Sequence, residues 1–216
     1  MINWYAMYAG ALAGSLLISG LLTAFMRRVA LRLGILDHPG ERKMQRDPVP
    51  LLGGAAIFLT CILVMVAVLA LLKPVRAFGP RWLEMNLLSF LGDEAFVKLF
   101  GVFLGGIIIF VLGLIDDIVA LRPYPKLLGE ILAALAVVLF GVRLDLFVPD
   151  ICPVAWLSWL LTSLVTILWI LLMTNAMNFL DNMDGLCAGI TVIASIPMFA
   201  TLVPHDAFVC LLLVVL

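Results

Sequence analysis

Apolar runs alternate with short polar segments along the whole chain. Each run is uncharged or nearly so, and most approach the roughly 20 residues that a helix needs to cross a bilayer. The runs cover residues 3–26, 52–72, 97–115, 127–142, 155–174 and 185–203. The fourth run is the shortest and carries Glu130 near its start. This pattern predicts an all-α, polytopic integral membrane protein with six full transmembrane helices.

A seventh apolar run follows His205-Asp206 and reaches Leu216. Because it is too short to cross a bilayer, we expect the chain to stop within a helix. Residues 1–216 are accordingly expected to form a single transmembrane domain that is the N-terminal portion of a larger fold.

The composition supports this class and excludes others. The chain is 65% hydrophobic and 12% charged, with a mean hydropathy of +1.23, whereas soluble domains are about 25% charged. The net charge of −1 says little about partners, but the lack of a basic patch or stripe argues against nucleic-acid binding. The four cysteines match no zinc or disulfide spacing. Residues 3–26 are too long for a signal peptide and carry arginines on the wrong flank.

Lysine and arginine predict the orientation of the chain. The loops at 27–50 and 116–126 hold eight of these residues, and the segments on the other side hold five. Cytoplasmic loops carry the excess of positive charge. We therefore expect the N-terminus outside and the ends of the first, third and fifth runs at the cytoplasmic face.

Asp116 and Asp117 end the third run at that face. Two adjacent carboxylates at a helix C-terminus repel each other and face the negative end of the helix dipole. They could be a solvated charge cap, although lysine or arginine would be the more favourable residue there. A Mg²⁺ ion would relieve both penalties, because it prefers carboxylate, amide and phosphate oxygens.

Three further charged residues lie near this face. Lys126 follows Arg122-Pro-Tyr-Pro125 and either reaches for the headgroups or neutralises a diphosphate or polyprenyl phosphate. Glu130 lies one helical turn beyond Lys126, so we expect a structural ion pair between the two. Lys43 lies in a basic loop, where contact with anionic lipid is the simpler explanation.

A ladder of oxygen-bearing side chains follows the fifth run. Asn175, Asn178, Asp181 and Asp184 recur every third residue and precede Gly185. If the segment is helical, they lie roughly along one side. The alternative is a polar loop between two helices, with Gly185 as a cap or turn. Together with the aspartates and Lys126, the ladder indicates a site at the membrane interface, whereas a secondary transporter would place its site near the midplane.

These motifs resemble those of the polyprenyl-phosphate N-acetylhexosamine-1-phosphate transferases, which are glycosyltransferase family 4. The matching segments are Gly113-Leu-Ile-Asp116-Asp117, Lys126-Leu-Leu-Gly129, Asn175-Ala-Met-Asn178-x-x-Asp181-x-x-Asp184-Gly185, and Arg42-Lys43 with Pro50-x-x-Gly53-Gly54. The asparagine-rich version is closer to the branch that starts O-antigen, enterobacterial common antigen or teichoic acid linkage units than to the muramyl-pentapeptide branch.

The resemblance implies a reaction and a set of partners. N-acetylhexosamine-1-phosphate, in particular GlcNAc-1-phosphate, would pass from a UDP-sugar to undecaprenyl phosphate, releasing UMP. The reaction would need Mg²⁺, with Mn²⁺ as an alternative ion. It would take place at the cytoplasmic face of the bacterial inner membrane, in the synthesis of cell-envelope polysaccharides such as lipopolysaccharide, and the enzyme would act in the bilayer, alone or as a homodimer.

The resemblance also implies roles for individual residues. The catalytic set would be Asp116, Asp117, Lys126, Asp181 and Asp184. Substrates would contact Lys43, Lys126, Asn175, Asn178, Asp181 and Asp184. The metal would be held by Asn178 with one or both of Asp116 and Asp117. Direct attack by the lipid phosphate and attack through a covalent aspartate intermediate both remain open.

Three departures from the family pattern qualify the resemblance. Asn182 follows Asp181 where the family has glycine, and Gln45 stands where it has histidine. The family has ten or eleven spans, with a further aspartate and a histidine-rich loop near the C-terminus. We therefore expect the 216-residue chain alone to be inactive. The alternative is a non-catalytic, transferase-like membrane subunit or a scaffold that binds the lipid carrier.

Overall fold

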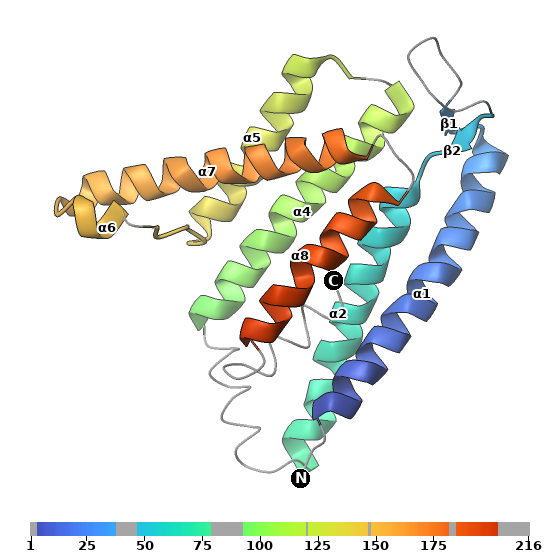
Figure 1. Ribbon diagram of the computed structural model, residues 1–216, viewed down its shortest axis with the longest axis horizontal. Coiled ribbons are helices and arrows are strands. Elements are labelled where there is room, and N and C mark those ends of the chain that lie inside the picture. Colours follow the sequence, from blue (N-terminus) through green and yellow to red (C-terminus); the bar gives the residue numbers. More distant parts are fainter. Residues whose placement is uncertain are drawn as a thin grey trace. The chain divides into compact units, whose positions relative to one another are not determined.

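Helices make up almost all of the chain that the structure describes (Figure 1). The computed structural model describes residues 4–37, 47–78, 93–119, 121–146, 148–181 and 185–202. It divides into two compact units, one formed by Met1–Leu87 with Ile190–Leu216 and the other by Leu88–Gly189. Each unit is considered by itself below.

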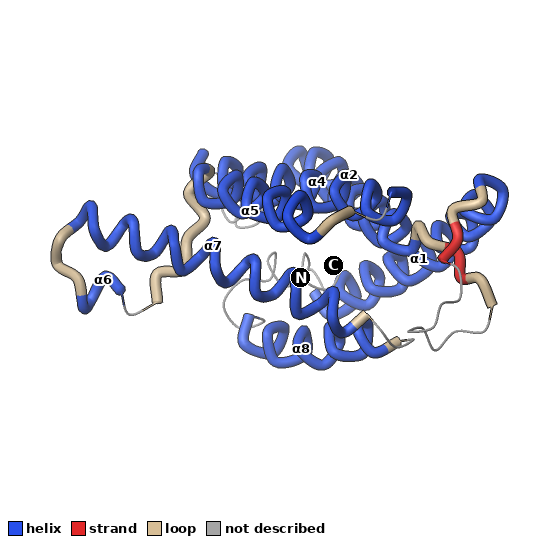
Figure 2. The backbone as a smooth tube through the Cα atoms, turned by 90° about the horizontal axis from the view of Figure 1, so that it is seen from above, coloured by secondary structure: helices blue, strands red, loops and turns tan. Residues whose placement is uncertain are grey.

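The first unit is built on a pair of packed helices. Its elements are α1 (Trp4–Leu33), β1 (Leu36–Asp37), β2 (Val49–Pro50), α2 (Gly53–Phe78) and most of α8 (Leu186–Leu202). Ala30 and Ala56 are completely buried, and Tyr8 meets Phe199 edge to face at 5.4 Å between ring centroids. The two strands form an antiparallel pair that the sequence did not predict (Figure 2). Strands of two residues are too short to show an alternating pattern.

The second unit carries most of the candidate residues. It contains α4 (Asp93–Val119), α5 (Pro123–Leu139), a single turn α6 (Val148–Ile151) and α7 (Ala155–Leu180). A short turn makes α4 and α5 a helical hairpin, and α7 packs across α5 (Figure 1). After the end of α5, the backbone N–H of Leu144 donates to Oγ1 of buried Thr166 in α7 at 2.9 Å.

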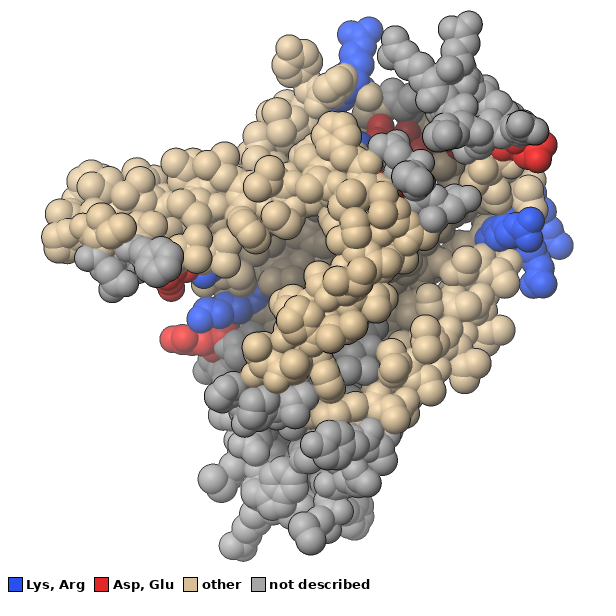
Figure 3. Space-filling model, in the orientation of Figure 1, with Lys and Arg blue, Asp and Glu red and all other residues tan. Residues whose placement is uncertain are grey.

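Length and composition support a multi-pass, all-α membrane protein. Among the described residues, three helical stretches are long and apolar enough to cross a membrane, Tyr8–Leu33, Val97–Val119 and Ala155–Leu180. Two shorter apolar stretches are Gly53–Ala67 and Leu186–Thr201. Few charged groups interrupt the visible surface of these helices (Figure 3). A helix overlaps every predicted run, but six full spans are not confirmed, because the 17 residues of α5 rise only about 26 Å.

Glycines allow α4 and α5 to pack closely. An added Cβ on Gly105 would lie 2.6 Å from Cγ2 of Val137, and one on Gly129 would lie 2.7 Å from Cδ1 of Leu112. At Gly101 an added Cβ would collide with Cβ of Phe140. Small residues at such positions let helix backbones approach each other in a membrane. The hairpin is therefore held in one register by contacts that a larger side chain would disrupt.

Gly101→Ala is expected to destabilise the second unit, whereas Gly113→Ala on the same helix is not. Cβ of Phe140 is fixed to the backbone and cannot rotate away, so α4 and α5 would have to separate, at a cost of about 1–3 kcal/mol. Nothing lies within 4 Å of a Cβ added at Gly113, and alanine is the better helix former by about 1 kcal/mol. Thermal unfolding in detergent measures both. Equal melting temperatures for the two variants would contradict a tight α4–α5 contact.

Candidate functional site

An ion pair joins the end of α4 to the start of α5. Nζ of Lys126 lies 3.0 Å from Oδ2 of Asp116, and both side chains are partly buried. The other carboxylate oxygen, Oδ1, accepts the backbone N–H of Leu121 at 2.9 Å. Asp116 lies in the last turn of α4, where no basic residue of α4 itself offsets the helix dipole. Lys126 supplies that positive charge from the next helix.

The turn between the two helices places Lys126 at this position. Arg122 is extended, with ψ of 154°, as expected before a proline. Pro123 and Pro125 lie in the first turn of α5, where the missing N–H groups have no intrahelical partner to lose. Lys126 follows in the same turn, and the contact of Gly129 with Leu112 keeps α5 close to α4. In the Lys-Leu-Leu-Gly motif, Lys126 thus provides the positive charge and Gly129 provides the close contact between the helices.

Asp117 occupies a different environment from its neighbour. Successive helical residues point about 100° apart, so the two carboxylates leave the helix in different directions. The structure leaves Asp117 exposed, whereas Asp116 is half-buried against the turn. The adjacent aspartates are therefore not equivalent. Asp116 holds the turn and the lysine, and Asp117 presents the more exposed carboxylate.

Glu130 faces α7 instead of Lys126. It is 2% exposed and its Oε2 accepts a hydrogen bond from Nδ2 of Asn175 at 2.6 Å. The predicted ion pair between Lys126 and Glu130 is therefore wrong. Each of the two finds its partner on another helix, because contacts between packed helices outweigh the small gain of an exposed pair within one helix.

The oxygen ladder begins in α7 and continues beyond it. Asn175 and Asn178 lie in the last turns of the helix, and Asp181 is its C-cap, with a backbone N–H that donates to the carbonyl of Met177 at 3.1 Å. Gly185, just before α8, has a φ of +75°, a left-handed conformation that favours glycine. The ladder therefore combines the two expected forms, a helical start and a turn. Asp184 and Lys43 lie outside the described residues.

Oxygen donors suited to a hard cation lie in this unit. Asp116 and Asp117 offer carboxylates, and Asn178 is exposed near the end of α7. Within the described ranges, no three histidine, cysteine, aspartate or glutamate side chains gather as a metal site. Asp116 nevertheless retains acceptor capacity, since a carboxylate has about four lone-pair positions and two are used here. The chemistry of these donors fits Mg²⁺ or Mn²⁺.

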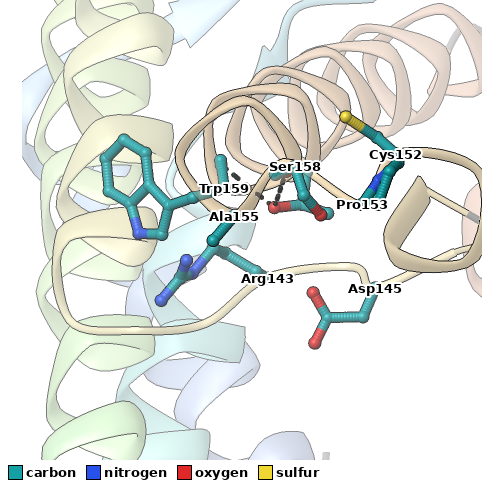
Figure 4. Close-up of a pocket in the computed structure, with 8 residues that line it drawn as sticks. Arg143, Asp145, Cys152, Pro153, Ala155, Ser158 and Trp159 are labelled. Atoms are coloured by element: carbon teal, nitrogen blue, oxygen red, sulfur yellow. Dashed lines mark hydrogen bonds between the residues drawn. The ribbon is translucent and has the colours of Figure 1, made fainter.

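A separate cavity of about 390 Å³ opens at the other end of the same unit (Figure 4). Arg143 and Asp145 reach it from the segment after α5, and Ser158 and Trp159 from the first turns of α7. The guanidinium of Arg143 lies 5.3 Å from the centroid of the Trp159 ring, a cation–π contact. Since Lys126 is at the opposite end of α5, this cavity does not belong to the carboxylate cluster.

Comparison with known proteins identifies several relatives. A probable undecaprenyl-phosphate N-acetylglucosaminyl 1-phosphate transferase of Bacillus subtilis is 33% identical, over 83% of this chain and 44% of its own length. A decaprenyl-phosphate N-acetylglucosaminephosphotransferase of Mycobacterium tuberculosis is 32% identical over 83% and 41%. An undecaprenyl-phosphate alpha-N-acetylglucosaminyl 1-phosphate transferase of Thermotoga maritima is 30% identical over 83% and 48%. The chain thus spans less than half the length of each of these relatives.

The family itself is shown by a match to a family model. No solved structure is significantly similar to the chain. The model of glycosyl transferase family 4 matches residues 99–216, which is more than half of the sequence and includes both the Asp116-Asp117 pair and the oxygen ladder. The chain belongs to glycosyl transferase family 4, as its polar motifs predicted.

Proposed function

We propose that this protein transfers GlcNAc-1-phosphate from UDP-GlcNAc to undecaprenyl phosphate and releases UMP. The relatives from Bacillus subtilis and Thermotoga maritima are named as undecaprenyl-phosphate N-acetylglucosaminyl 1-phosphate transferases. The observation that carries the proposal is the Asp116–Lys126 pair beside exposed Asp117, at the turn of a helical hairpin. A fixed lysine next to an accessible carboxylate suits the chemistry of two phosphorylated substrates.

Phosphoryl transfer depends mainly on positioning and on neutralising charge. Lys126 would bring its positive charge to the phosphates, and Asp116 would keep that charge in place through the 3.0 Å pair. Asp117 would orient the lipid phosphate and take its proton, or attack the diphosphate itself. When bound, Mg²⁺ would neutralise the diphosphate of the UDP-sugar, held by Asn178 with Asp116, Asp117 or both.

The remaining residues would recognise the nucleotide and the sugar. Asn175, Asp181 and Asp184 would contact the UDP-sugar, and Lys43 would counter phosphate charge from the first loop. The N-terminus would lie outside, so that the ends of α4 and α7 and the start of α5 meet the cytoplasm. This places the soluble donor and the lipid acceptor at the same interface, in a membrane protein that crosses the bilayer six times within this chain and acts alone or as a homodimer.

Release of UMP tests this function directly. Membranes that contain the protein as its gene encodes it are expected to release UMP from UDP-GlcNAc only when undecaprenyl phosphate and Mg²⁺ are both supplied. EDTA should abolish the release, and Mg²⁺ or Mn²⁺ should restore it. Saturable binding of undecaprenyl phosphate without UMP release would contradict the enzyme and indicate a lipid-carrier scaffold instead.

A further inference from the structure

Glu130 is a buried carboxylate in the contact between α5 and α7. Its side chain comes from an apolar stretch of α5 and is 2% exposed, beside completely buried Ala134 on the following turn. Burying a carboxylate is unfavourable unless hydrogen bonds compensate for the lost water. Asn175 provides such a bond at 2.6 Å. An apolar residue would fill this position at a lower cost, so the buried carboxyl group calls for a functional explanation.

The contacts of Asn175 fix which end of its amide a ligand can meet. Nδ2 donates to Oε2 of Glu130 at 2.6 Å and to the carbonyl of Leu171 at 2.9 Å. The carbonyl of Leu171 can only accept, so the reversed amide would turn its oxygen toward another oxygen. The two N–H groups are therefore committed within the protein. The carbonyl oxygen, Oδ1, is the group left for a ligand.

We propose that Glu130 is a positioning residue that holds Asn175 with Oδ1 toward the substrate, where it accepts a hydrogen bond from an N–H or O–H group of the UDP-sugar. This inference rests on the proposed function. Phosphate oxygens are acceptors and cannot bond to Oδ1, so Asn175 would recognise the sugar or the base instead of the diphosphate. Glu130 lies one turn from Lys126 on α5, so a single helix would present the phosphate-binding charge and orient the residue that reads the donor.

Two substitutions of similar size separate positioning from packing. Glu130→Met keeps the volume but removes the acceptor, and should raise KM for UDP-GlcNAc about tenfold, the size of one lost hydrogen bond. kcat, KM for undecaprenyl phosphate and the Mg²⁺ concentration for half-maximal activity should stay within about threefold. Glu130→Gln keeps an acceptor and should largely restore KM. The melting temperature of Glu130→Met should stay close to that of the parent, because the lost hydrogen bond to Asn175 is offset by the removal of a buried carboxyl group.

Controls connect the effect to Asn175. Glu94→Met makes the same change at a carboxylate that is 93% exposed on α4, and should leave KM unchanged. In an Asn175→Ala background, Glu130→Met should have no further effect, because the residue that it orients is gone. An unchanged KM in Glu130→Met, or independent effects in the double variant, would overturn the proposal. A shift in the Mg²⁺ requirement with KM for UDP-GlcNAc unchanged would also overturn it, since Oδ1 would then serve the ion.

A measurement that does not require turnover keeps the inference apart from the proposed function. With ¹⁵N-asparagine labelling, the side-chain amide of Asn175 should show a downfield proton and slow exchange, both lost in Glu130→Met and kept in Glu94→Met. If UMP release fails in the parent while this signature is present, the proposed function is wrong and the Glu130–Asn175 contact stands. If the signature is absent, Glu130 does not hold Asn175.

Discussion

Lys126→Met is expected to lower kcat for UMP release by at least about 100-fold, the usual loss when one charge-stabilising group is removed from a transfer site. The variant removes the cation that meets the phosphates. It also leaves the carboxylate of Asp116 unpaired at the C-terminal end of α4, where the helix dipole already disfavours negative charge. The first consequence removes an attraction for the anionic substrate, and the second adds a repulsion. The expected loss of kcat therefore exceeds that for any residue that only contacts the sugar.

Stability should fall modestly in the same variant, because Asp116 loses its ion-pair partner but keeps the backbone N–H of Leu121 as a donor. The pair is about a quarter exposed on each side, so solvent screens part of its energy. Lys126→Arg keeps the charge but changes its shape and reach, so we expect intermediate activity. Lys98→Met is the matched control, because Lys98 is half-exposed on α4 and pairs with Glu94 at 3.9 Å. A Lys126→Met enzyme with kcat close to that of Lys98→Met would remove Lys126 from the catalytic set.

The pairing of charges shows where prediction from the sequence reached its limit. Topology placed Asp116 and Lys126 on the same side of the membrane, but it could not show that they touch. They are ten residues apart across a turn, a separation for which no helical period predicts a contact. The local rule predicted Lys126 with Glu130, and the structure assigns each a different partner. The sequence signal that could have been used is the position of Glu130 directly after Gly129. A glycine there lets α5 pack closely against a neighbouring helix, and Glu130 is buried.

The ends of the helices were harder to predict than their positions. An apolar run shows which residues can enter the membrane, but a helix can continue past that run wherever the backbone remains helical. α7 continues to Leu180, beyond the apolar run that ends at Thr174, because Asn175 finds side-chain partners there and Ala176 and Met177 are good helix formers. α5 begins at Pro123, ahead of the predicted start at 127, since proline is favoured in a first turn. These shifts place Lys126 and Asn175 within helices, outside the apolar runs themselves.

Asp117→Asn is expected to lower kcat by about 100-fold or more, without a matching loss of stability. Asparagine keeps the size of the side chain and an oxygen acceptor, but it can neither take a proton nor attack a phosphate. It also reduces the negative charge available to hold a divalent cation. Because Asp117 is exposed near the end of α4, the folded state should tolerate the change, and the melting temperature should stay within about 2 °C.

Two aspartates provide the comparison for this substitution. Asp145→Asn changes an exposed carboxylate at the other end of the same unit, beside Arg143 in the separate cavity, and should keep full activity. Asp116→Asn should lose activity and also weaken the turn, because its carboxylate holds both Lys126 and the backbone of Leu121. Stability would then distinguish the two neighbours, with Asp116 needed for the site to form and Asp117 needed for the reaction. Unchanged turnover in Asp117→Asn would contradict that division and leave Asp116 as the sole carboxylate of this pair in the site.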